Sequence, residues 1–149
     1  MSEYAGIGTL FQRGDGASPE AFTTIAQVAD ISGPKLSAST YDTTTHDNTL
    51  SGYKDFIAGL KEAGEITLHL FVDATQATHK NASGGLISDF NGGAAHNYRI
   101  VPAGYSPALY WLFSALVTGL GEFKYPVDGV QDGMVTFKIK GKPSKMLEA

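Results

Sequence analysis

The chain has 149 residues, of which 42% are hydrophobic and 17% charged, with 18 glycines and no cysteine. This length fits one domain with a single core, and the composition is that of a soluble globular protein rich in turns. The net charge of -4 disfavours ordinary nucleic-acid binding, and the lack of cysteine excludes disulfides and thiolate zinc sites.

The first twenty residues are predicted to form an N-terminal arm. The segment MSEYAGIGTLFQRGDG has no basic start followed by an apolar run, so we expect no secretory signal. Its few apolar residues stand among glycines and lead into a turn between Asp15 and Pro19. We therefore expect residues 1–20 to be an extended arm or an edge segment.

Two strands are predicted next. Residues 22–32 are rich in threonine, isoleucine and valine, and they end at Gly33-Pro34, a strong strand terminator. Residues 35–45 alternate loosely and contain few large side chains. We expect the second of these strands to be partly solvated.

A long polar connector, HDNTLSGYKDFIAGLKEAG, separates the second strand from the next one. Tyr53, Phe56, Ile57 and Leu60 are spaced i, i+3, i+4 and i+7, which would form an apolar stripe on a helix of about two turns. Connectors of this length are usually functional or disordered. Because the apolar stripe argues against disorder, we predict a long hairpin arm over residues 43–64.

The clearest strand signal follows this connector. In EITLHLFVD, residues 65–73, Ile66, Leu68, Leu70 and Val72 alternate with a more polar face that includes His69. A half-exposed strand position is the expected environment of that histidine.

A short helix and a short strand come next. Leu86, Ile87 and Phe90 could form the apolar face of a helix that stops at Gly92-Gly93. The segment HNYRIVPAG then favours a strand over residues 98–101.

Residues 106–120 permit two structures. Ser106 and Pro107 could begin a buried helix, since the following apolar residues recur at helical spacing. The alternative is a long strand with Trp111, Phe113, Ala115 and Val117 on one face. Periodicity alone favours the helix. The apolar run from 109 to 120 is shorter than the roughly 20 residues that span a bilayer, so we expect no membrane segment.

The last predicted strand lies in GMVTFKIKGKP. Val135, Phe137 and Ile139 alternate with Thr136 and lysines, so one face should contact solvent. Residues 144–149 are expected to be a C-terminal tail.

No pattern in the sequence indicates catalysis, and we expect neither enzyme activity nor a cofactor nor a metal site. The four histidines do not have ligand spacing, and Ser83-Gly84-Gly85 lacks the strand-turn-helix context of a nucleophile elbow. No phosphate-binding glycine pattern precedes a lysine. Nothing singles out a pair among the scattered carboxylates at Glu65, Asp73, Asp89 and Asp128.

Four segments in order carry a family resemblance: VADISGPKLSASTYDTTTHD, SGYKDFIAGLKEAGEITLHLFVD, ALVTGLGEF and VTFKIKGKP. The resemblance extends over roughly residues 22–143. Their order and spacing resemble those of the major tail tube proteins of long-tailed, lambda-like bacteriophages with non-contractile tails. Some relatives carry an additional immunoglobulin-like C-terminal domain, whereas we predict a single tail tube domain over residues 1–149.

The resemblance implies a mainly β, sandwich or barrel-like tail tube fold with one short flanking helix near residues 85–90. It also implies that residues 108–119 form a strand, and we adopt that prediction over the helix. Six copies would form a ring whose strands join into an inner barrel, and stacked rings would form the tube for genome delivery. The implied location is the virion, after synthesis in the host bacterial cytoplasm.

The resemblance further implies partners. These are other copies of the chain, together with the tape measure, tail tip and tail terminator proteins. DNA would pass through the tube without specific binding, which agrees with the acidic net charge, because an acidic lumen repels phosphate.

The arm is the segment that we expect to contact a neighbouring subunit, because an apolar stripe on a projecting segment has too little core of its own. The predicted contact residues are Thr43, Thr44, Asp47, Tyr53, Lys54, Phe56, Ile57 and Leu60.

Two other functions remain open from the sequence. A monomeric carbohydrate- or ligand-binding β-sandwich is suggested by Trp111 and the seven tyrosines, although core and subunit packing explains such aromatics better. A hydrolase with a metal site made from distant histidines is a more remote alternative.

Overall fold

The computed structural model describes residues 5–47 and 52–149. Its elements, in chain order, are β1 (Leu10–Gly14), β2 (Phe22–Thr24), β3 (Val28–Ser32), β4 (Ser37–Asp42), β5 (Phe56–Glu62), β6 (Glu65–Phe71), α1 (Leu86–Gly92), β7 (His96–Val101), β8 (Tyr110–Lys124), β9 (Asp132–Ile139) and β10 (Lys145–Glu148). The mainly β fold with one short helix is thereby confirmed. No helix among the described residues is both long and apolar enough to cross a membrane.

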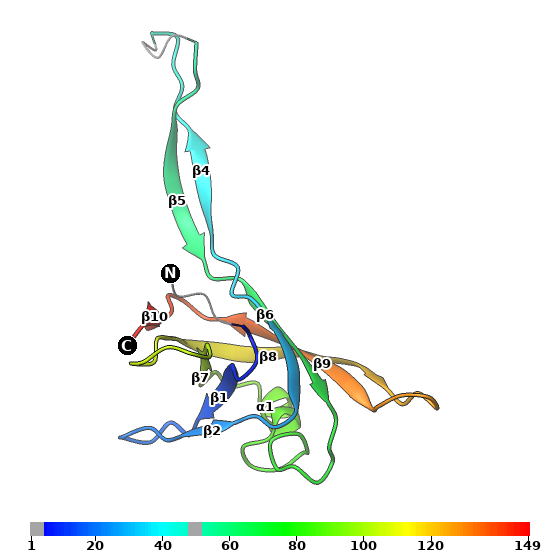
Figure 1. Ribbon diagram of the computed structural model, residues 1–149. Coiled ribbons are helices and arrows are strands. Elements are labelled where there is room, and N and C mark those ends of the chain that lie inside the picture. The colour runs from blue at the N-terminus through cyan, green and yellow to red at the C-terminus, as the bar shows by residue number, and fades with distance from the viewer. Residues whose placement is uncertain (1–4, 48–51) are drawn as a thin grey trace.

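Two sheets form a body and an arm (Figure 1). The body is an eight-stranded antiparallel sheet in the order β2-β1-β7-β8-β9-β6-β3, with β10 added beside β8. The arm is the separate two-stranded sheet of β4 and β5, which projects away from the body. The chain therefore leaves the body after β3 and returns to it at β6.

The core lies on one face of the curved body sheet. Phe11 in β1 and Phe137 in β9 are nearly fully buried, and their ring centroids are 5.1 Å apart. Two strands, β7 and β8, separate β1 from β9 in the sheet. A flat sheet would therefore hold these backbones about 14 Å apart at roughly 4.8 Å per strand. The ring contact indicates that the sheet curls around its aromatic core.

The alternation predicted for residues 65–73 and for the last strand is confirmed. Leu68 of β6 lies opposite Val135 of β9, and both side chains are buried. Ile66 likewise lies opposite Phe137, and both are buried. These two central strands therefore carry their apolar residues at period two, as half-buried antiparallel strands do.

The ambiguous segment is a strand, as the family resemblance implied and the helical spacing did not. β8 is 15 residues long, and Phe113, Ala115 and Val117 are buried on one face. Trp111 packs on the edge of the same core. The helical spacing was misleading because Leu112 and Leu116, on the other face, are also partly buried. Apolar residues on both faces of a strand imitate the pattern of a buried helix.

Three predicted boundaries differ from the structure. Residues 22–32 form two strands, β2 and β3, separated by a turn in which Gln27 has a φ of 58°. Within the predicted N-terminal arm, β1 pairs with both β2 and β7, and Phe11 is part of the core. Within the predicted C-terminal tail, β10 pairs with the start of β8. Both chain ends thus contribute strands to the body.

The helix α1 is at its predicted place. It ends at Gly93, whose φ of 68° gives the left-handed C-cap that glycine favours. Leu86 is buried against the sheet, whereas Phe90 is about half exposed. α1 therefore covers one end of the core with Leu86. Phe90, which the sequence placed on the same apolar face, remains about half exposed.

A buried polar cluster fastens α1 to the sheet. The Arg13 guanidinium donates to both carboxylate oxygens of Asp89, at 2.7 and 2.8 Å, and the Tyr98 hydroxyl donates to the same carboxylate at 2.9 Å. Hydrogen bonding to Asp89 raises the pKa of Arg13, and burial raises the pKa of Tyr98. Donors from two strands, β1 and β7, therefore converge on the buried Asp89 carboxylate of α1.

Candidate assembly surfaces

The arm consists of two paired strands that project from the body, which they contact at their base through the ion pair between Glu62 and Lys138. Ser37 of β4 lies opposite Glu62 of β5, and the pairing continues to Asp42 opposite Phe56. All six residues of β4 are exposed, as are all residues of β5 except Gly59. An isolated two-stranded sheet is at best marginally stable in water. Both of its faces are therefore available for covering by another molecule.

The short helix predicted from the apolar stripe is wrong, because residues 56–62 are the strand β5. Successive strand residues point to opposite faces, so Phe56 and Leu60 lie on one face and Ile57 lies on the other. The side chains are exposed by 51% at Phe56, 83% at Leu60 and 56% at Ile57. The apolar residues thus flank the arm on both faces instead of forming one stripe.

Gly59 is the one residue of the strands β4 and β5 that is half-buried instead of exposed. A Cβ atom at Gly59 would collide with the ring of Tyr41, which lies opposite Ile57 in the pairing. The ring of Tyr41 therefore lies across the backbone of β5 at Gly59. Tyr41 is itself 55% exposed, so one edge of the ring still contacts solvent.

We call the described residues 41–47 and 52–56 the arm end. Side chains hold its backbone in place: the Thr44 hydroxyl accepts from the Asp55 N–H at 2.8 Å, and Asp42 accepts from the Thr44 N–H at 2.9 Å. The Thr45 hydroxyl donates to Asp47 at 2.6 Å. Hydrogen bonds from Thr44 lower the pKa of Asp42, and the bond from Thr45 lowers that of Asp47. The arm end is therefore ordered and acidic.

The structure places all eight predicted contact residues on the arm. They divide between the arm end, with Thr43, Thr44, Asp47, Tyr53 and Lys54, and the strand β5, with Phe56, Ile57 and Leu60. All of them are exposed. Their contact with a neighbouring subunit stays a prediction.

A groove lies at the base of the arm, and we call it the root groove. It has a volume of about 620 Å³ and is lined by Leu36, Ser37, Ala38, Lys61, Glu62, Ala63, Gly141, Lys142, Pro143 and Met146. The segment after β9 and the strand β10 form one wall, and the first residues of the arm form the other. The sequence could not place these residues together, because they come from three separate parts of the chain.

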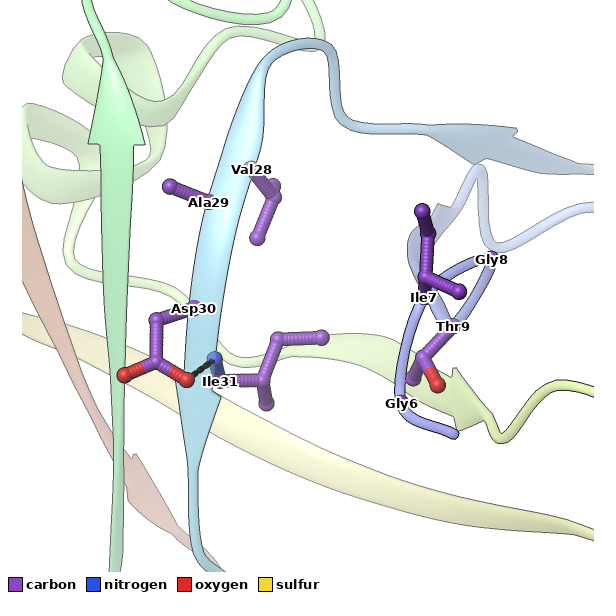
Figure 2. Close-up of a pocket in the computed structure, with 8 residues that line it drawn as sticks. All are labelled: Gly6, Ile7, Gly8, Thr9, Val28, Ala29, Asp30 and Ile31. Atoms are coloured by element: carbon purple, nitrogen blue, oxygen red, sulfur yellow. Dashed lines mark hydrogen bonds between the residues drawn. The ribbon is translucent and has the colours of Figure 1, made fainter. Parts of the chain in front are cut away.

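A second recess lies beside the free edge of β3 (Figure 2). It has a volume of about 500 Å³ and lies between residues 6–9 and residues 28–31. Val28 and Ile31 point across it toward Ile7 and Thr9, whereas Asp30 points away. Asp30 also accepts a hydrogen bond from the N–H of Ile31 at 2.9 Å. The side chains of Val28, Ile31 and Ile7 give this recess an aliphatic lining, so it offers a surface for packing.

A third exposed surface is the turn between β8 and β9, which the sequence did not single out. Val127 is completely exposed, Tyr125 is 68% exposed and Val130 is 62% exposed. Apolar residues at an exposed turn indicate a contact surface when they occur together. In the sequence, the sign of this surface is that Tyr125, Val127 and Val130 fall within the six residues YPVDGV.

Two histidines in the described part of the chain, His69 and His79, have structural partners. His79 is buried, with Nε2 2.6 Å from the Ala26 carbonyl oxygen and Nδ1 accepting from the Asp73 N–H at 3.1 Å. His69 is half exposed on β6 and lies 3.0 Å from Asp132. Among residues 5–47 and 52–149, no group of three or more potential ligands could hold a metal ion.

Trp111 and Tyr98 do not support the carbohydrate-binding alternative. Trp111 lies opposite Ile100 on one side and Met146 on the other, and it packs against the core. Tyr98 is completely buried in the aromatic cluster. These rings stabilise the body, and they are not arranged as an open platform.

Comparison with known proteins agrees with this architecture. A family model described as "Lambda phage tail tube protein, TTP" matches residues 3–145. A search of curated protein sequences found no significant match.

Solved structures share the fold at low sequence identity. A chain from the virion of a native gene transfer agent particle has a TM-score of 0.71 at 14% identity, with 97% of this chain and 99% of that chain covered. A chain from the tail of an empty gene transfer agent particle, with C6 symmetry, has a TM-score of 0.70 at 16% identity and the same coverage. A chain from the cap that terminates the tube of the anti-feeding prophage has a TM-score of 0.68 at 16% identity, with 98% and 95% covered.

Proposed function

This chain belongs to the lambda phage tail tube protein family, and from that membership we propose that six copies form a ring and that rings stack into a hollow tube. The chain is a tube-forming structural protein of the phage virion. Ring formation by six copies is supported by the C6 symmetry stated for a tail structure that shares this fold. The partners in the tail are other copies of the chain and, at the ends of the tube, other tail proteins.

The arm is the observation that carries this proposal. It projects from the body as a two-stranded sheet with Phe56, Ile57 and Leu60 at least half exposed. Exposed apolar residues of this kind lose contact with water only when another molecule covers them. Because the body contains the complete core, the arm is available for assembly without disturbing the fold.

The subunit has two separate exposed surfaces, which suits it to the same contact repeated between many copies. The arm extends on one side of the body, and the turn between β8 and β9 extends elsewhere (Figure 1). Two different surfaces on one subunit give head-to-tail contacts, which close into rings or continue as filaments. A tube made of stacked rings needs contacts that close each ring and contacts that continue from one ring to the next.

We further propose that the subunit has no catalytic activity and that DNA passes through the tube without specific binding. The net charge of -4 per chain supports this, because cationic sites along the lumen would retain phosphate groups. The tape measure, tail tip and tail terminator proteins are the proposed partners inside the tube and at its ends.

Negative-stain electron microscopy of the purified protein tests the proposal. We expect hollow tubes or six-fold rings at high protein concentration, and longer tubes when tail-tip proteins are added. A protein that stays monomeric in analytical ultracentrifugation, at all concentrations and with the tail-tip proteins present, would contradict it. A glycan-array signal that is specific and saturable would instead favour a binding module.

A further inference from the structure

The arm end and the root groove carry opposite charges. Among the described residues of the arm end, Asp42, Asp47 and Asp55 are exposed beside a single lysine, Lys54. Hydrogen bonds within the arm end keep the pKa values of Asp42 and Asp47 low. The arm end is therefore negatively charged over the whole neutral range and into moderately acidic solution.

The root groove has the complementary charge. Lys61 and Lys142 line it, and neither forms an ion pair with any residue that the structure describes. Its one acidic lining residue, Glu62, is already paired with Lys138 at 2.6 Å, and that pairing lowers the pKa of Glu62. The groove thus presents two uncompensated positive charges.

Both surfaces also contain apolar side chains. Leu36 and Met146 in the groove are 47% and 38% exposed. Tyr41 and Phe56 at the arm end are 55% and 51% exposed. An interface in which apolar contacts are flanked by complementary charges gives both affinity and a defined register.

The arm end cannot reach the groove of its own chain. Ser37 lines the groove, and the strand β4 leads from it to Asp42 over roughly 17 Å, at about 3.3 Å per residue. The pairing of β4 with β5 keeps this segment extended. An arm end that occupies this groove would therefore have to come from another molecule.

We propose that the arm end of one copy docks into the root groove of a second copy. Asp47 and Asp55 of the first copy face Lys61 and Lys142 of the second, while Tyr41 and Phe56 cover Leu36 and Met146. The inference rests on the proposed tube assembly and specifies the surface that receives the arm. The contact is head-to-tail, so every copy gives one arm end and receives another.

Charge reversal tests this contact after the wild-type protein has been shown to form tubes. The groove variant carries Lys61→Glu and Lys142→Glu, and the arm variant carries Asp47→Lys and Asp55→Lys. Each should remain folded by circular dichroism and should raise the critical concentration for tube formation by about tenfold or more, because like charges then face each other. As a matched control, Lys80→Glu should have less effect than Lys61→Glu alone, since Lys80 is exposed outside both surfaces.

Restored complementarity separates this contact from a general charge effect. A chain carrying all four reversals should assemble within about twofold of the wild-type critical concentration. An equimolar mixture of the groove variant and the arm variant should also form tubes, because each acidic surface then meets a basic one.

Two results would overturn the inference. One is a groove variant that assembles as well as the Lys80→Glu control, and the other is a four-fold reversal that assembles no better than the two-fold ones. In both cases wild-type tubes would still form, so the proposed function would stand. Failure of the wild-type protein to form any tube would contradict the proposed function itself.

Discussion

Arg13 and Asp89 form a two-pronged ion pair, with Nε to Oδ2 at 2.7 Å and Nη2 to Oδ1 at 2.8 Å, which joins β1 to α1 across 76 positions of the sequence. Asp89 is 4% exposed and also receives the Tyr98 hydroxyl. His96 Nε2 lies 3.4 Å from the same carboxylate. One carboxylate therefore fixes the position of the helix on the sheet.

Removal of one partner should destabilise the body strongly. Arg13→Ala leaves the Asp89 charge buried with fewer donors, so we expect a loss of about 3–5 kcal/mol in the free energy of unfolding. Tyr98→Phe removes one donor and should cost only about 1–2 kcal/mol. Urea denaturation followed by circular dichroism measures both. Equal losses in the two variants would contradict the dominant role of the ion pair.

The N-terminal strand should be essential for folding. Phe11→Ala removes a ring that contacts Tyr98, Phe113 and Phe137, and we expect it to cost about 3–5 kcal/mol. Ile7→Ala is the control, because Ile7 is 88% exposed and should change stability by less than about 0.5 kcal/mol. Thermal unfolding of the two variants provides the comparison. If the N-terminal strand were dispensable for folding, the Phe11→Ala and Ile7→Ala variants would have similar melting temperatures.

Polar substitutions on the arm should separate folding from assembly. The double variant Phe56→Ser and Ile57→Ser changes two exposed side chains on opposite faces of β5, so the body should unfold at nearly the wild-type temperature. The same variant should fail to form tubes, as judged by sedimentation and electron microscopy. If the double variant instead loses the fold of the body, the two side chains belong to the core of the subunit.

The arm end should lose order only in acid. Hydrogen bonds from Thr44 lower the pKa of Asp42 below its ordinary value of 3.8. A lowered folded-state pKa stabilises the arm end above about pH 3.8, and this contribution is lost as the pH falls through the lowered value. Titration of the Asp42 carboxyl by nuclear magnetic resonance should show the shift. Thr44→Ala should move that pKa part of the way back, while an unchanged pKa would contradict the role of the hydroxyl.

The return of the chain from the arm to the body should depend on glycine. Gly64 has a φ of 79°, and an added Cβ atom would lie 2.5 Å from the Lys35 carbonyl oxygen. We expect Gly64→Ala to cost more than about 1 kcal/mol, measured by urea denaturation. Gly92→Ala is the control, since no atom crowds that position at the end of α1. Equal stabilities would show that the backbone at residue 64 can relax.

Local patterns identified the strands that pair on both sides and bury one face. The alternation in β6 and β9 was readable because Leu68 and Val135 point to the core while their neighbours contact solvent. In β8, periodicity alone favoured a helix, since apolar residues occupy both faces. Family resemblance, and not residue spacing, gave the correct structure there.

In the arm, residue spacing predicted the wrong secondary structure. A long hairpin arm was predicted from the connector, but the short helix that its apolar spacing suggested was wrong. The spacing of Phe56, Ile57 and Leu60 suits a helix, whereas pairing with β4 makes the segment a strand. The Arg13–Asp89 pair and the root groove were also missed, because each depends on residues that only the folded chain brings together.

The strand β10 gives the subunit a practical point of attachment. It pairs with the first residues of β8, and Met146 lines the root groove beside the arm. A fluorophore attached after Ala149 would therefore start close to that groove. Its emission would change whenever the groove was filled, so the C-terminus could serve as an optical reporter of tube growth in real time.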